Sequence, residues 1–87
     1  MTNMRCAVRD AIELLLSNLD RYEDSEREIL NRMLRLLTEI REGKGLVSHL
    51  EALSILAERL EGDARGSVGV PVLTLMQRQE EAFIAHV

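Results

Sequence analysis

Apolar residues recur at every third or fourth position along most of this chain, the spacing that puts side chains on one face of an α-helix. The pattern predicts helices over residues 3–19 and 26–42, a third that begins after Gly45 and stops at Gly62, and a fourth that begins at Pro71. The expected core stripes are Met4, Val8, Ala11, Ile12, Leu15 and Leu19; Ile29, Leu30, Met33, Leu36, Leu37 and Ile40; Leu50, Leu53, Leu56, Ala57 and Leu60, with Ile55 beside them; and Leu73, Met76, Phe83, Ile84 and Val87.

Polar residues mark the expected helix starts. Asn3 is expected to cap the first helix. Two pairs, Ser25–Glu28 and Ser48–Glu51, have the spacing of a capping box. In a capping box the serine hydroxyl accepts from an early backbone N–H while the glutamate reaches back to the cap residue. We therefore expect capping boxes at the second and third helices.

Glycines and the single proline indicate where helices end and restart. Gly43 suits the left-handed conformation that ends a helix, and Gly62 is expected to end the third helix in the same way. The glycine-rich run 63–70 is predicted to be a loop. Pro71 suits the first turn of a helix, where its missing N–H does no harm. Because no β-type alternation persists, the prediction is an all-α fold: one compact four-helix bundle over residues 1–87.

Composition narrows the classes of function. Of the 87 residues, 46% are hydrophobic and only 2% are aromatic, so the core is aliphatic and a stacking platform for nucleobases is lacking. The net charge is −4 with both signs interspersed, which argues against phosphate or nucleic-acid binding. No apolar run reaches the roughly 18 residues expected of a membrane span. The single cysteine fits a reducing cytoplasm.

The isolated reactive side chains favour structural roles. Cys6 is expected to be a small buried hydrophobe. His49 and His86 lack the Cys, His or Asp neighbours of a zinc site and are expected at the surface. No nucleophile–base or acid–base pair can be assembled from the sequence. The expectation is a protein that is not an enzyme and has no cofactor.

The chain carries more leucines than the core stripes need. Leu14, Leu15 and Leu16 are consecutive, and a single seam cannot bury all three. Exposed apolar surface of this kind often marks an interface, although a bundle helix can also bury extra leucines against two neighbours. The segment 62–69 is a second candidate contact surface, even though Val68 and the following Val70 are expected to tuck inward. The candidate interface residues are Leu14, Leu16, Leu34, Leu75, Val68 and Val70.

A series of short fragments, in order, resembles one known family. The fragments are Arg32–Leu37, residues 39–45 (Glu-Ile-Arg-Glu-Gly-Lys-Gly), Leu53, Leu56–Ala57, Leu60–Gly62, Pro71–Val72 and residues 81–87. Their order and spacing resemble the C-terminal iron–sulfur domain of the NADH-binding subunit of complex I, and the related diaphorase subunits of NAD-reducing hydrogenases and formate dehydrogenases. The resemblance implies a four-helix bundle.

The same resemblance implies a lost cluster site. In that family three cysteines before the second helix, and a fourth in the loop before the last helix, hold a four-iron cluster. The matching positions here are Asp20, Glu23 and Glu26, and the late loop, 63–70, contains no cysteine. An iron–sulfur cluster needs thiolate ligands. The expectation is therefore a bundle that retains the shape of the family but not its redox activity.

Three hypotheses of function follow. The first is a non-catalytic interaction module, an accessory or assembly subunit of a flavin and iron–sulfur NADH-linked oxidoreductase. The second is a self-associating, homodimeric structural or regulatory protein. The third is a divalent-metal site at Asp20, Glu23 and Glu26, because hard cations prefer oxygen ligands, although carboxylates are also typical of a helix start. The sequence names neither the partner nor the oligomeric state.

Overall fold

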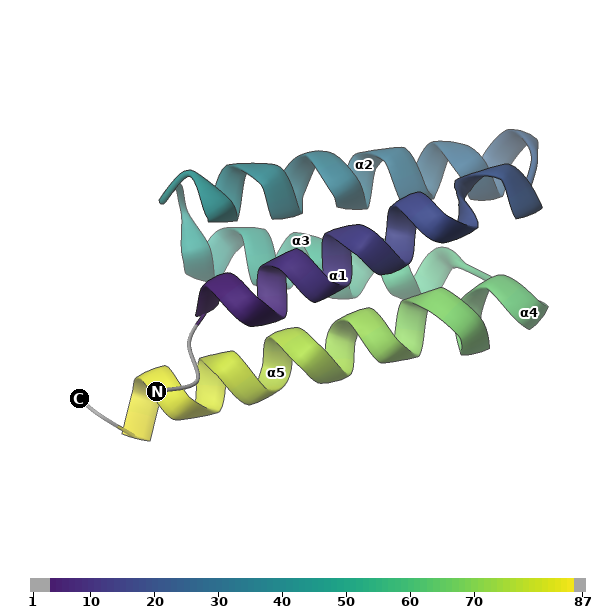
Figure 1. Cartoon of the computed structure of the whole chain (residues 1–87). Coiled ribbons are helices and arrows are strands. Elements are labelled where there is room, and N and C mark those ends of the chain that lie inside the picture. The colour runs from purple at the N-terminus through teal and green to yellow at the C-terminus, as the bar shows by residue number, and fades with distance from the viewer. Residues whose placement is uncertain (1–3, 86–87) are drawn as a thin grey trace.

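Four helical arms run back and forth along one long axis in the computed structural model, which describes the backbone of residues 4–85 (Figure 1). Side chains are described for residues 6–45 and 47–78. The elements are α1 (Met4–Asn18), the 3₁₀ turn η1 (Leu19–Arg21), α2 (Asp24–Arg41), α3 (Leu46–Arg59), the short α4 (Gly62–Ala64), the π-helical turn η2 (Arg65–Gly69) and α5 (Val70–Ala85). The prediction of an all-α four-helix bundle is confirmed.

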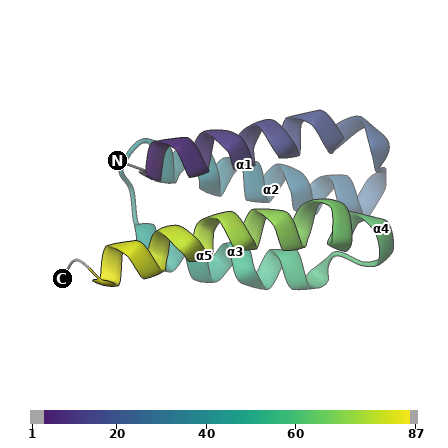
Figure 2. The ribbon, with the colours of Figure 1, turned by 60° about the horizontal axis from the view of Figure 1, so that its bottom comes forward.

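The arms form a square in cross-section. α1 contacts α2 and α5, and α3 contacts the same two helices from the other side. The turn between α2 and α3 lies at one end of the bundle, and the α1–α2 and α3–α4 connections lie together at the other (Figure 2). The molecule measures 40 × 20 × 19 Å along its principal axes, so its core is one long aliphatic column.

The helical stripes fill this column largely as predicted. Leu15, Leu30, Leu53 and Met76 have no or almost no exposed surface. Ile55 is expected beside the third stripe, but 55% of its surface is exposed. Ile55 lies about 200° around the helix from Leu53, since each residue turns the helix by about 100°, and so it points away from the core. Met4, Phe83, Ile84 and Val87 lie outside the described side chains.

The α2–α3 turn confirms the expected role of Gly43. This glycine has a positive φ of 87°. Its N–H donates to the carbonyl of Ile40, and the N–H of Lys44 donates to that of Glu39, at 2.9 and 3.0 Å. These two bonds make a Schellman motif, which satisfies carbonyls that the helix end leaves without partners.

The expected capping boxes are wrong, because both helices start earlier than their serines. α2 begins at Asp24, a non-glycine residue in the left-handed region, so Ser25 already lies within the first turn. α3 begins at Leu46, and the Ser48 hydroxyl donates to the carbonyl of Gly45 instead of accepting at the cap. Neither helix has a side-chain cap hydrogen bond. The Asn3 cap lies outside the described residues.

The segment 62–69 is helical, which corrects the predicted loop. α3 ends at Arg59, before Gly62, and Gly62 begins the next helical turn with a φ of 57° instead of ending α3. The turn η2 is a π-helix directly before Pro71. A proline ring clashes with the carbonyl four residues earlier in a regular helix, and a wider π-turn relieves that clash. α4, η2 and α5 therefore form one continuous arm.

Close packing explains why a glycine-containing segment is helical here. Ala64 and Val68 are buried in the core. A Cβ on Gly69 would lie 3.3 Å from a methyl group of Leu60 and 3.4 Å from the carbonyl oxygen of Ala57. The glycine thus lets η2 approach α3 closely, and burial of the valine and alanine compensates for its low helix propensity.

Candidate functional site

The seam between α2 and α3 carries an open groove of about 500 Å³ on the outside of the bundle. Ile55 lies in the groove, and Leu36, Ala52 and Leu56 add apolar surface that is half-buried or buried. The remaining lining residues are three exposed arginines, Arg32, Arg35 and Arg59. Among the residues that the structure describes, no carboxylate lines this groove. It therefore joins apolar surface to positive charge in a chain whose net charge is −4.

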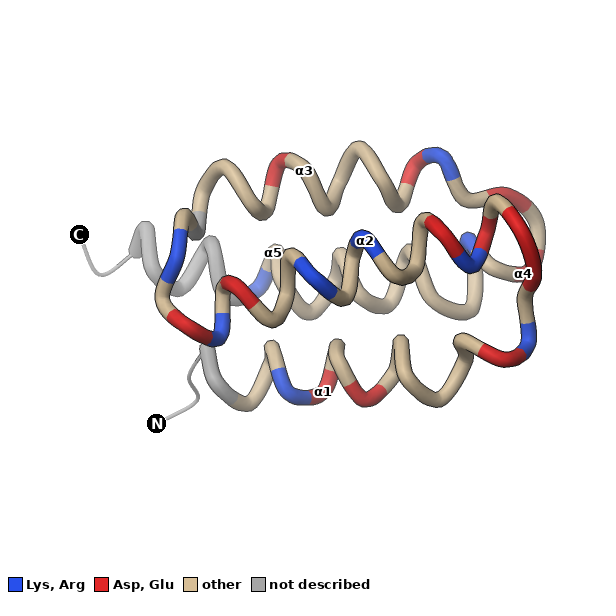
Figure 3. The backbone as a smooth tube through the Cα atoms, turned by 90° about the horizontal axis from the view of Figure 1, so that it is seen from above, with Lys and Arg blue, Asp and Glu red and all other residues tan. Residues whose placement is uncertain are grey.

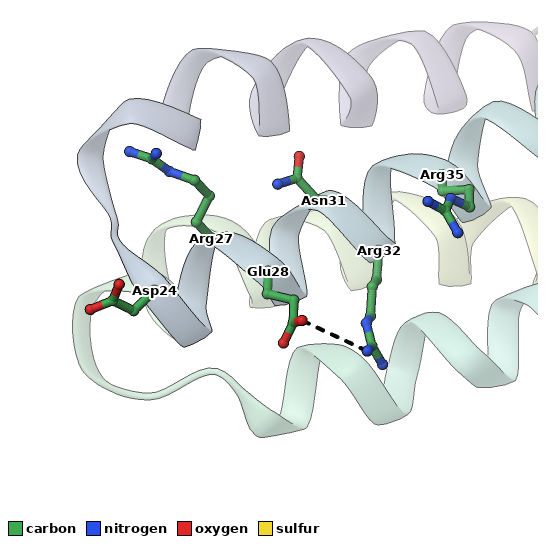
Figure 4. Close-up of a pocket in the computed structure, with 6 residues that line it drawn as sticks. All are labelled: Asp24, Arg27, Glu28, Asn31, Arg32 and Arg35. Carbon is green, nitrogen blue, oxygen red and sulfur yellow. Dashed lines mark ion pairs between the residues drawn. The ribbon is translucent and has the colours of Figure 1, made fainter.

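The arginines of the groove have few internal partners. Arg32 lies 3.9 Å from Glu28, a long contact between two exposed side chains. Arg32 and Arg35 also line an adjoining pocket on α2, together with Asp24 and Glu28. The close-up of that pocket in Figure 4 shows Arg32 directed from α2 toward the neighbouring helix, with Arg35 one turn further along. Arg35 helps to lower the pKa of Glu39 through its charge. Among the described residues, however, Arg35 and Arg59 make no ion pair within 4.0 Å. Their hydrogen-bonding groups are consequently available to a ligand.

A second groove, between α3 and α5, provides a contrast within the same molecule. Its volume is about 210 Å³, and its lining includes Leu50, Leu73 and Met76. The polar lining residues are Glu51, Ser54 and Gln77, so the described lining contains a carboxylate and no arginine. The α3–α5 groove thus has less than half the volume of the α2–α3 groove, and its one charged lining residue is negative instead of positive.

A polar cluster centred on Asp63 in α4 lies where the helix connections meet at one end of the bundle. Carboxylates gather around the α1–α2 and α3–α4 connections, whereas arginines mark the middle of α2 (Figure 3). The Tyr22 hydroxyl donates to Asp63 at 2.6 Å, Arg21 donates to the same oxygen at 3.1 Å, and Ser67 donates to the other oxygen at 3.2 Å. These bonds tie η1 to α4 and η2, across more than 40 positions of sequence.

The same contacts set the ionisation of the cluster. The hydrogen bond from Tyr22 is the main cause that lowers the pKa of Asp63, and Ser67 and Arg21 act in the same direction. In return, the carboxylate raises the pKa of Tyr22. The guanidinium of Arg21 also lies 5.5 Å from the centre of the Tyr22 ring, within the range of a cation–π contact. The cluster therefore links two connections of the same chain, and the charges of Arg21 and Asp63 are already paired with each other.

Arg27 holds the turn that leads into α2. Its Nε donates to the carbonyl of Leu19 at 3.3 Å and to that of Tyr22 at 3.1 Å. In Figure 4 its side chain points toward the end of the first arm, away from Arg32. Arg27 therefore acts on the backbone of this chain and contributes little to the groove.

The sequence did not indicate the pairing of His49 with Glu39. The two side chains lie on α3 and α2, and their Nε2 and Oε1 atoms are 2.6 Å apart. The histidine, expected at the surface, has only 18% of its side chain exposed. This hydrogen bond is the main cause that lowers the pKa of Glu39. The one signal in the sequence that could have suggested this pair is that the two residues lie ten positions apart, on either side of the Gly43 turn. His86 lies outside the described residues.

The three carboxylates at the expected cluster positions lie around the start of α2. Asp20 belongs to η1, Glu23 is the residue before α2, and Glu26 is in its first turn. Glu23 and Glu26 are thus near a helix N-terminus, where negative charge is favoured. Within the described residues, no group of three or more His, Cys, Asp or Glu side chains is arranged to hold a metal ion.

The candidate interface residues divide into three groups. Leu16 and Val70 are exposed, at 54% and 52%, so Val70 does not tuck inward. Leu14, Leu34 and Leu75 are partly buried and pack against the core. Val68 is fully buried, which confirms that it tucks inward and makes it wrong as a contact residue, because the helical conformation of η2 turns it into the core. Two further residues are exposed without having been expected to be, Val47 at 59% and Ile55 at 55%.

Cys6 is exposed, which corrects the expectation of a buried hydrophobe. It precedes the buried pair Ala7 and Val8 but falls outside the stripe that continues through Ala11 and Ile12. Its position on the outer side of α1 follows from the helical period.

No protein-family model, no curated protein and no solved structure matches this chain. Among the described helices, none combines the length and the apolar character needed to cross a membrane.

Proposed function

We propose that this chain is a non-catalytic protein-interaction module, an accessory or assembly subunit of a larger flavin and iron–sulfur NADH-linked oxidoreductase. The observation that carries the proposal is the set of exposed aliphatic side chains on outward helix faces: Leu16, Val47, Ile55 and Val70. The core is already filled by other residues, so these side chains are not needed for the fold. Apolar surface with a polar rim is typical of contact surfaces, and Ile55 lies in a groove together with three arginines.

The conspicuous polar contacts fit the same proposal. The Asp63 cluster joins the helix connections at one end, and the Glu39–His49 pair joins α2 to α3 near the other. Both sets of contacts hold parts of this chain together, so they have a structural explanation that needs no catalytic role. The oxidoreductase setting of the proposal comes from the resemblance of the fragments between Arg32 and Val87 to the complex I domain.

The test is purification of the native complex from the source cells with the chain untagged. Antibody detection after native electrophoresis would follow the chain, and mass spectrometry would identify the proteins that migrate with it. We expect a stoichiometric complex that contains a flavin or iron–sulfur oxidoreductase subunit. Recovery of only the free chain, or of a self-dimer that buries α1, would overturn the proposal; the dimer would favour the homodimeric alternative.

A further inference from the structure

The groove between α2 and α3 offers two kinds of contact side by side. Ile55 supplies an exposed aliphatic group, and Leu36 and Ala52 extend the apolar surface around it. Arg32, Arg35 and Arg59 provide the charged part of the lining. A ligand that fills this groove must therefore present apolar groups to its floor and negative groups to its rim.

The geometry favours a helix as the ligand. The groove lies along the seam of two neighbouring helices, and an amphipathic helix can bury its apolar face in such a seam with anchors at i, i+3 or i+4 and i+7. From Ala52 to Arg59, α3 rises about 10 Å, so the groove accommodates about two turns of a partner helix. Packing of a third helix onto two others is also how this bundle builds its own core.

The charge of the groove indicates that the partner helix carries negative charge. The chain as a whole is acidic, at −4, yet the charged residues that line the groove in the described part of the chain are all arginines. A basic or purely apolar helix would leave Arg35 and Arg59 without an ion-pair partner within 4.0 Å among the described residues. Arginine also binds carboxylates with two parallel hydrogen bonds, which gives orientation as well as attraction.

A nucleic acid fits the groove less well. Its phosphates would satisfy the arginines, but the apolar surface of Ile55 and Leu36 would face a polar backbone. Among the described side chains there is one aromatic residue, Tyr22; it is engaged with Asp63 and does not line the groove. Base stacking, the usual apolar contribution to single-strand binding, is therefore not available in this groove.

We propose that the α2–α3 groove binds an acidic amphipathic helix of a partner protein, with aliphatic anchors against Ile55 and carboxylates on Arg32, Arg35 and Arg59. This inference rests on the proposed function, since it names the chemistry of the partner for which an interaction module is needed. It selects one face of the bundle from several that carry exposed aliphatic residues.

The test uses a fluorescent amphipathic peptide of 14 residues, the length of α3. The peptide carries leucines at i, i+4 and i+7 and glutamates along both sides of that stripe. Two matched peptides replace every glutamate by glutamine or by lysine. Fluorescence anisotropy with the full chain measures affinity. We expect the glutamate peptide to bind at least about tenfold more tightly than the glutamine peptide, with no binding of the lysine peptide, and to weaken as salt rises.

Variants of exposed residues locate the binding. Ile55→Ser and Arg35→Glu should each weaken the glutamate peptide about tenfold or more, from lost aliphatic burial and from charge reversal. The matched controls are Val47→Ser, on the same helix but outside the groove, and Arg78→Glu on α5. Both controls should bind as the parent chain does. Circular dichroism confirms that all four variants retain the helical fold.

Equal binding of the glutamate and glutamine peptides would overturn the inference. Equal losses in the groove and control variants, or tighter binding of a single-stranded oligonucleotide to the same groove, would do the same. A self-dimer that Ile55→Ser dissociates would also overturn it, because a second copy would then be the occupant. A native complex that survives Ile55→Ser and Arg35→Glu refutes the groove but leaves the proposed function intact. Peptide binding without any native complex refutes the proposed function instead.

Discussion

The two halves of the α2 surface use their arginines in opposite ways. Near the start of α2, Arg27 donates to two backbone carbonyls, and Arg21 in the preceding turn donates to Asp63 and Asn18. Further along, Arg35 makes no ion pair among the described residues and lines the α2–α3 groove beside Ile55. Arginines therefore bind groups of this chain near the start of α2, whereas Arg35 in the α2–α3 groove is available to bind a ligand.

This difference separates structural charge from charge that is available for binding. A cation with several internal acceptors stabilises the fold and has little left to offer a partner. A cation without them contributes little to stability and keeps its hydrogen-bonding capacity for an external carboxylate. By this criterion the Asp63 end is the structural region, and the groove is the candidate binding region.

The largest expected contrast concerns two aliphatic residues near the end of the third arm. Leu60 is fully buried and packs against η2, whereas Ile55 is 55% exposed in the groove. Leu60→Ala should lower the free energy of unfolding by about 2–5 kcal/mol through cavity formation. Ile55→Ala should change it by less than about 0.5 kcal/mol. Urea denaturation followed by circular dichroism measures both. Similar losses for the two variants would place Ile55 in the core and remove the contrast.

The next contrast concerns two glycines of the π-turn. Gly69→Val should lower the free energy of unfolding by about 1–3 kcal/mol, because the new side chain would press on Leu60 and on the Ala57 carbonyl. Gly66 is exposed, and a Cβ added there would meet no atom within 4 Å, so Gly66→Ala should raise stability by about 0.4–1 kcal/mol. Thermal unfolding of both variants checks the pair. A stabilised Gly69→Val variant would show that close approach of η2 to α3 is not required.

A smaller effect distinguishes the arginines themselves. Arg27→Gln removes the donor to the carbonyls of Leu19 and Tyr22 and should cost about 0.5–1.5 kcal/mol. Arg35→Gln should stay within about 0.5 kcal/mol of the parent. Denaturant titration at fixed salt compares the two. If Arg35→Gln proved the more damaging, the groove arginine would have a structural role and the division between structural and available charge would fail.

The smallest effect is on the response to acid. Folding lowers the pKa of Asp63 from its ordinary value of 3.8, mainly through Tyr22. The resulting stabilisation is fully present above the unfolded pKa and is lost as the pH falls through the lower, folded pKa. In Tyr22→Phe this acid-dependent loss should be reduced, and the pKa of Asp63 should rise toward its ordinary value. NMR titration of the carboxyl carbon from about pH 2 to about pH 6, a range that brackets the ordinary pKa of an aspartate, measures it. An unchanged pKa would mean that Tyr22 does not hold Asp63.

Much of the fold was predictable because the helical period is a local property. The buried faces of Val8 to Leu15, Leu30 to Ile40 and Leu50 to Leu60 follow from three-and-four spacing. Gly43 ends α2 as its conformational freedom predicts. Helix starts were less predictable, since Ser25 and Ser48 have capping-box spacing yet lie one residue or more inside their helices. Local signals of this kind overlap, and the packing of neighbouring helices selects among them.

The candidate site was less predictable than the fold. The period places Ile55 opposite Leu53 but does not say whether another helix covers that side. The leucines singled out in the sequence proved mostly half-buried, and of these only Leu16 is as exposed as Ile55. The convergence of Arg32 and Arg35 with Arg59 depends on how α2 and α3 face each other. No spacing within either helix records that relation.

By itself, the sequence determined four amphipathic helices and most of their buried faces, because both depend on interactions within a few residues. Only the tertiary structure decided that residues 62–69 are helical, that Tyr22 and Arg21 meet Asp63, and that an arginine-lined groove stays open beside Ile55. Those features join residues that are distant along the chain. The interactions between these residues form only once the helices have packed.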